Sequence, residues 1–114
     1  MGRSEATSRS ETAKVTYRLE VRSDALADIE EAAQWYDQRE VSLGAEFLSE
    51  VLQGIDVVLT NPLAYRVRHR RKNVRWKLLD RFPYRVVYQI ARDLVTVFAV
   101  LHSARHDRQW QNRS

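Results

Sequence analysis

Apolar and polar positions alternate near the start of the chain, then recur with a helical period, and alternate again towards the end. In residues 15–21, Val15, Tyr17, Leu19 and Val21 fall on one face and polar residues on the other. This period of two predicts a strand that buries one face.

Two helical patterns follow this strand. The first predicts a helix that begins at an N-cap, Ser23 or Asp24, and ends near Arg39; the second predicts a helix that stops at Asn61 and Pro62, because proline disfavours helical dihedrals in the residue before it. The expected apolar stripes are Leu26, Ile29, Ala33 and Tyr36 in the first helix, and Phe47, Val51, Ile55, Val58 and Leu59 in the second. The link between them is short, so the two helices should pair antiparallel.

Residues 73–79, 84–91 and 94–102 are rich in β-branched and aromatic residues, which predicts three further strands. The last two flank a tight connection at Arg92 and Asp93, which favours a hairpin. The last strand is apolar at nearly every position, so we expect it to be covered on both faces. The order β-α-α-β-β-β predicts an α+β fold, with an antiparallel helical hairpin on one face of a four-stranded, mostly antiparallel sheet.

Length and composition favour one domain over residues 15–114, preceded by a polar, flexible tail at residues 1–14. The chain has no cysteine, which excludes disulfides and thiolate metal sites and favours a reducing compartment. No apolar run approaches the roughly 18 residues of a membrane span. We therefore expect a cytoplasmic protein with no membrane segment, cofactor or metal.

The net charge of +4 is distributed unevenly. Residues 1–65 hold 6 Lys and Arg against 12 Asp and Glu, a net −6, whereas residues 66–114 hold 13 against 3, a net +10. A half with this balance indicates binding to a polyanion, either nucleic acid or an acidic protein segment. A solvated basic surface with no partner would have the same composition.

Strand parity predicts where these cations point. Arg85 shares one side of its strand with Val87 and Gln89, and we expect this side to be open, with Arg85 standing out towards phosphate or carboxylate. The other cations expected to converge with Arg85 on an anion- or target-binding surface are Arg75, Lys77, Arg81, Arg105 and Arg108. Trp76, Tyr84 and Trp110 either stack on bases or belong to the core.

His102 ends the last strand, where it acts either as an acid or base or as a structural side chain bonded to backbone. The basic half holds only three carboxylates, Asp80, Asp93 and Asp107, and no glycine-rich phosphate loop. This composition argues against a two-metal nuclease built on clustered acids, and any phosphoryl transfer would be metal-free, with an RNA 2'-hydroxyl as nucleophile.

Several segments resemble the RelE/ParE superfamily of toxins from bacterial type II toxin–antitoxin systems, over about residues 15–110. They are "EAAQWYDQREVSLGAEFLSEV", the proline that closes the second helix, "FPYRVVYQI" and "VLHSARHDRQW". The resemblance implies a toxin that forms a hetero-oligomer with a cognate antitoxin, which suits an acidic partner folding onto a basic surface. Growth inhibition and plasmid stabilisation are the biological roles that it implies.

The superfamily contains ribosome-dependent mRNA endoribonucleases and inhibitors of DNA gyrase. The ribonuclease pattern matches at Arg85 and Arg105, but Trp76 and Leu78 stand where it has lysines, Arg75 and Lys77 have the opposite parity, and Trp110 stands near its tyrosine. This depletion favours a ParE-like gyrase inhibitor, which is not an enzyme. The alternatives are a metal-independent ribonuclease that acts on mRNA at the ribosome through His102, Arg85 and Arg105, or a degenerate antitoxin-binding protein without toxic activity.

Overall fold

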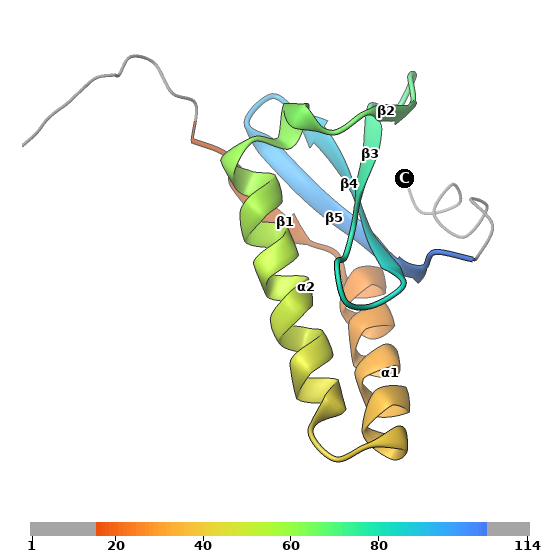
Figure 1. Cartoon of the computed structure of the whole chain (residues 1–114). Helices are drawn as coiled ribbons and strands as arrows, with labels where there is room; N and C mark the ends of the chain where they lie inside the picture. Colours follow the sequence, from red (N-terminus) through yellow and green to blue (C-terminus); the bar gives the residue numbers. More distant parts are fainter. Residues whose placement is uncertain (1–15, 105–114) are drawn as a thin grey trace, which may run out of the picture.

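The structure is a computed structural model that describes residues 16–104; Val15 and the expected tail at 1–14 lie outside them (Figure 1). The elements in chain order are β1 (Arg18–Val21), α1 (Ser23–Arg39), α2 (Leu43–Thr60), the 3₁₀ turn η1 (Pro62–Ala64), β2 (Val67–His69), β3 (Val74–Leu78), β4 (Tyr84–Ala91) and β5 (Leu94–His102).

The strands form a single sheet in the order β1-β5-β4-β3-β2. Neighbouring strands are antiparallel except β1 and β5, which are parallel. The predicted α+β fold, a helical hairpin on a mostly antiparallel sheet, is confirmed, but the sheet has five strands rather than four. The additional strand, β2, has only three residues, too few for an alternating pattern to be visible in the sequence.

The helices run antiparallel and together cover one face of the sheet (Figure 1). The stripe predicted for α2 is confirmed, since Phe47, Val51, Ile55 and Val58 are buried and Leu59, half-buried, packs against them. No helix in the described part of the chain has the length and apolar content that a membrane span requires.

The stripe predicted for α1 is partly wrong. Ala25, Ile29 and Ala32 are buried, whereas Leu26 is 55% exposed. Small side chains let α1 lie so close to β5 that the Asp28 carboxylate accepts a hydrogen bond from the Val100 N–H at 3.0 Å. The N-cap is also one residue earlier than predicted, at Arg22, and no side chain caps it.

β5 is buried on both faces, as predicted, and a β-bulge makes this possible. The register with β4 passes from Val87↔Ala99 to Tyr88↔Val97, which leaves Phe98 as the extra residue. Phe98 and Ala99 consequently both pack on the face away from the helices, in a cluster with Val74. Val97 and Val100 pack on the helical side, so the sheet separates two apolar clusters.

The connection between β4 and β5 is the predicted tight turn, with Arg92 at a positive φ of 59°. The second residue of this turn is Asp93, whose carboxylate accepts hydrogen bonds from Arg18 Nε at 3.2 Å and Nη2 at 3.1 Å. The hydrogen bond with Arg18 lowers the pKa of Asp93. This exposed pair, together with the bond from Arg18 N–H to the Asp93 carbonyl, aligns β1 parallel to β5.

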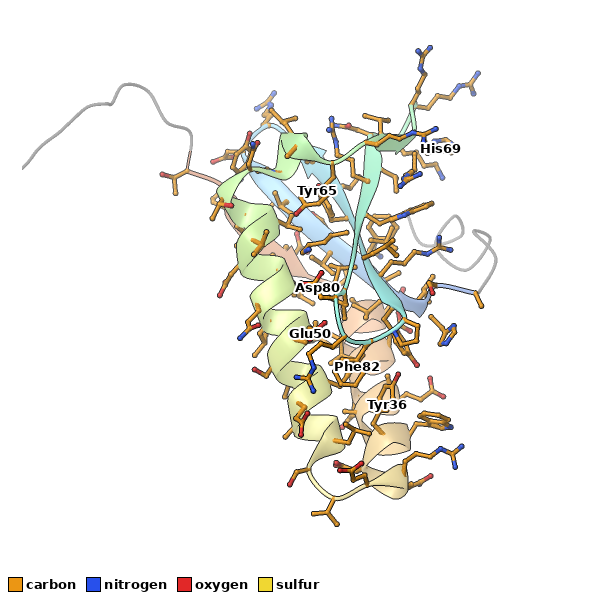
Figure 2. The ribbon with its side chains drawn as sticks, in the orientation of Figure 1. Tyr36, Glu50, Tyr65, His69, Asp80 and Phe82 are labelled. Carbon is orange, nitrogen blue, oxygen red and sulfur yellow. The ribbon has the colours of Figure 1, made fainter. Side chains whose placement is uncertain are left out.

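The segment "FPYR" connects the loop after β3 to the start of β4. Phe82 and Tyr84 pack with Tyr36 and Phe47, and ring centroids in this group lie 4.9–6.1 Å apart. Figure 2 shows Phe82 and Tyr36 close together beneath this loop. The aromatic cluster thus fixes the start of β4 against both helices, and the next residue, Arg85, must point to the other face.

The start of α2 lies against α1 at Gly44. Its N–H donates to Asp37 Oδ1 at 2.8 Å, and a Cβ added there would overlap the Ala33 carbonyl oxygen and lie 2.7 Å from Asp37 Cγ. Gly54 is a second buried glycine, and a Cβ added there would lie 3.0 Å from Leu79 Cδ2. That atom is the end of a side chain that can rotate.

Gly44→Ala should therefore lower the free energy of unfolding by about 1–3 kcal/mol, because the new methyl group meets backbone. Gly54→Ala is the matched control. The Leu79 side chain can move away from the new methyl group, and the higher helix propensity of alanine stabilises the protein by up to about 1 kcal/mol. Urea unfolding of both variants measures the difference. Equal changes in the two variants would mean that Gly44 is not needed for helix contact.

Tyr88 anchors η1 to the sheet, because its buried hydroxyl donates to the Pro62 carbonyl at 2.7 Å. Burial raises the pKa of Tyr88. Above about pH 10 the unfolded chain loses this proton while the folded chain keeps it, so the stability supplied by Tyr88 decreases as pH rises.

Tyr88→Phe should cost about 1–3 kcal/mol at neutral pH, since it leaves a buried carbonyl without its donor. The difference between wild type and Tyr88→Phe should become smaller between pH 9 and 11, as measured by urea unfolding at each pH. A difference that stays constant or grows with pH would contradict this role.

Candidate functional site

Arg85 lies on the face of the sheet away from the helices, as strand parity predicts, but it does not stand out into solvent. Only 7% of it is exposed. Its cross-strand neighbours are Leu78 and Leu101, and its guanidinium carbon lies 4.3 Å from the centre of the Trp76 ring. The expectation that Arg85 points into solvent was wrong, because the indole ring of Trp76 on β3 offers a surface on which the Arg85 side chain packs.

Trp76 also contacts a second arginine. Arg68, on β2, places its guanidinium carbon 4.6 Å from the same ring centre. The indole therefore receives one cation from each neighbouring strand. This arrangement occupies the ring that was a candidate for stacking on bases, and it holds two positive charges within one side-chain cluster.

Arg75 and Lys77 lie on the opposite face, with Tyr88 and Val86 as their cross-strand partners. Arg75 Nη1 donates to the carbonyls of Leu63 at 3.1 Å and Tyr65 at 2.7 Å. Arg75 thus ties η1 to the sheet. Neither cation joins Arg85 in one surface, because a shift of one residue turns a side chain to the other face.

Arg81 is engaged by α2. Its Nη2 donates to Glu46 at 2.6 Å and its backbone N–H to Glu50 at 2.5 Å. Figure 2 shows Glu50 facing the loop that holds Asp80. The ion pair with Glu46 is exposed, so it contributes little stability, but it orients Arg81 towards the helix.

His102 and Arg85 lie on opposite faces of the sheet. His102 pairs with Tyr84, at a ring separation of 5.2 Å, on the side that faces the helices. Its Nδ1 accepts a hydrogen bond from Ala104 N–H at 3.1 Å, which corresponds to the structural role considered for this residue. The candidate catalytic set of His102, Arg85 and Arg105 is therefore not brought together among the described residues; Arg105, Arg108 and Trp110 lie outside them.

A groove of about 520 Å³ lies on the His102 side, between α1 and the ends of β4 and β5. It exists because β1 pairs with β5 only as far as Val97, and α1 covers the remaining edge. Its lining includes Asp28, Glu31, Trp35, Tyr84 and His102. Two carboxylates among aromatic rings suit a cationic or apolar side chain rather than an anion.

Sequence reasoning missed Arg68 and the groove. Five residues of α1 line the groove, and three of them, Asp28, Glu31 and Trp35, follow helical spacing beside the buried stripe, so a signal was present. Arg68 had none, because its role depends on pairing between β2 and β3, which begins at Val67↔Arg75 and shifts register before His69.

Comparison with known proteins agrees with this geometry. Residues 19–107 match the model of the ParE toxin of type II toxin–antitoxin systems, parDE. The chain belongs to the ParE toxin family. No curated protein matches the sequence.

Two solved structures share the fold of this toxin. One, the chromosomal ParDE toxin–antitoxin system from P. aeruginosa, has a TM-score of 0.68 at 12% identity, over 76% of this chain and 96% of that one. The other, the isolated E. coli RelE toxin, has a TM-score of 0.58 at 21% identity, over 85% of this chain and 95% of that one. The RelE/ParE fold expected from the sequence is confirmed.

In this toxin, the Trp76 ring should be what holds Arg85 in its buried position. A double-mutant cycle on unfolding free energy, with Trp76→Leu and Arg85→Met, should give a coupling of about 1–2 kcal/mol. The control is the pair Trp35 and Arg39, which has similar geometry at 4.1 Å but lies on an exposed helix face. Its coupling should be about 0.5 kcal/mol, and equal couplings in the two pairs would contradict the argument.

Proposed function

We propose that this toxin inhibits DNA gyrase and that a cognate acidic antitoxin neutralises it in the cytoplasm. The match to the ParE family over residues 19–107 supports the first part, because gyrase inhibition is the activity that the sequence resemblance implies for ParE-like members. Growth inhibition, and plasmid stabilisation where a plasmid encodes the pair, would follow from this activity.

The observation that carries the choice of target is the separation of Arg85 from His102. A metal-free ribonuclease needs an acid or base and a cation on the same side of the scissile phosphate. Among residues 16–104, Arg85 is buried beside Trp76, Leu78 and Leu101, and His102 lies on the other face. This geometry favours gyrase inhibition over mRNA cleavage at the ribosome.

The antitoxin proposal rests on charge. Residues 66–104 hold ten Lys and Arg but only two carboxylates, Asp80 and Asp93, and Asp93 is paired with Arg18. An acidic segment that orders on this half would gain electrostatic steering and buried area. The resemblance to a solved ParDE system is consistent with a hetero-oligomer.

The test adds the purified toxin to gyrase with supercoiled plasmid and, separately, to translating ribosomes with a defined message. We expect trapped, cleaved plasmid in the first assay and no codon-positioned cuts in the second. His102→Ala should leave gyrase inhibition unchanged, because His102 ends β5 in a structural hydrogen bond with Ala104 N–H and lies on the opposite face from Arg85.

Each other result contradicts part of this proposal. Message cuts that disappear in His102→Ala would establish the ribonuclease alternative. Inactivity in both assays, with antitoxin binding retained, would identify a degenerate toxin.

A further inference from the structure

The strongest unassigned feature is the basic hairpin, defined here as residues 66–75, which comprises β2, its turn and the start of β3. Five of the seven residues at 66–72 are Arg or Lys, and His69 is a sixth basic residue. Arg66, Arg68, Arg70 and Arg71 are all exposed. The hairpin stands at the end of the sheet apart from both helices (Figure 1), and Figure 2 shows nitrogen-tipped side chains extending beyond His69.

We propose that the basic hairpin binds the phosphate backbone of duplex DNA. This inference goes beyond gyrase inhibition, because such binding requires no gyrase. The toxin would then bind directly to the DNA on which gyrase acts.

The tip of the basic hairpin is held rigidly. Asn73, in a left-handed conformation at φ 52°, donates through Nδ2 to the Ile90 carbonyl at 3.1 Å. Gln89 Nε2 donates to the Lys72 carbonyl at 2.8 Å, and Asn73 N–H donates to the Arg70 carbonyl at 3.2 Å. These bonds join the turn to β4, so its cations meet a ligand with little backbone entropy left to lose.

The charge of the basic hairpin is not neutralised by the residues that the structure describes. Within residues 16–104, the guanidinium groups of Arg66, Arg70 and Arg71 form no hydrogen bond or ion pair with another described residue. The two described carboxylates of the basic half are distant in the fold or engaged: Asp80 follows the far end of β3, and Asp93 binds Arg18.

The composition of the basic hairpin favours nucleic acid over an acidic protein as its ligand. Protein interfaces depend on an apolar or aromatic centre. The segment 66–72, "RVRHRRK", offers only Val67, which is 37% exposed. A phosphate backbone, in contrast, is recognised by charge alone.

The aromatic rings near the basic hairpin favour a duplex over a single strand as its ligand. Single-stranded nucleic acids are bound by stacking bases on aromatic rings. The nearby rings are already occupied: Trp76 carries Arg68 and Arg85, and Tyr65 packs edge-on against Tyr88 at 6.4 Å. A two-stranded ribbon rich in arginine is a shape that a DNA groove admits.

The test measures fluorescence anisotropy of a short labelled DNA duplex of mixed sequence with the full-length toxin, without gyrase, over a range of salt concentrations. The Arg70→Gln/Arg71→Gln variant should bind more weakly than wild type. The log of its association constant should also fall less steeply with log salt, by about 2 in the slope, because each of the two arginines neutralises one phosphate. The control, Arg22→Gln/Arg39→Gln, removes the same charge from the two ends of α1, at its N-cap and its last residue, and should retain the wild-type slope.

The remaining arms use the corresponding single strand, an RNA duplex of the same sequence and polyglutamate as competitor. Equal salt slopes in the two double variants would overturn the proposal. Binding to the single strand or to the RNA duplex that is as tight as binding to the DNA duplex, or tighter, would also overturn it. So would complete displacement of the DNA by polyglutamate at equal charge. Circular dichroism checks that both variants are folded. Wild-type toxin that inhibits gyrase but does not bind the duplex would refute only the hairpin inference. Wild-type toxin that binds the duplex but does not inhibit gyrase would refute only the proposed target.

Discussion

The arrangement of this toxin depends on the alternation of side chains along the paired strands β4 and β5. Tyr84 packs under the helices with Phe82 and Phe47, so Arg85 must face the other way. The bulge at Phe98 changes this alternation once, which lets β5 supply apolar side chains to both faces. Since His102 lies beyond the bulge in register with Tyr84, its separation from Arg85 follows from backbone geometry and not from the choice of a rotamer.

The same geometry explains how a cation is accommodated within an apolar cluster. Arg85 lies on the face that holds Val74, Val87 and Leu101. A buried guanidinium is costly unless a compensating interaction replaces water. The Trp76 ring supplies such an interaction and shares it with Arg68. A tryptophan at this position therefore suits a structural role for the arginine, whereas two lysines on the same face would have repelled it and favoured an anion between them.

The sequence was sufficient for most of the fold. The bounds predicted for β4 and β5 agree with the structure because runs of β-branched and aromatic residues and a two-residue connection mark them clearly. Ala25 and Ala32 were missed because a helix facing a close neighbour buries its small residues, whereas the larger Leu26 was favoured by hydrophobicity alone. β2 was missed because its three residues are held by cross-strand pairing and not by local preference.

The site was harder to predict, since charge along a sequence does not say which cations are already engaged. Arg75 bonds to two carbonyls at η1, Arg81 to Glu46 and Arg18 to Asp93. When such engaged cations are set aside, the remaining positive charge of the described chain is concentrated at the basic hairpin and not around Arg85. A basic half-sequence thus contains two populations of cations, one that holds the fold together and one that remains available to a polyanion. Only the fold, through the bonds that it makes to carbonyls and carboxylates, separates the two.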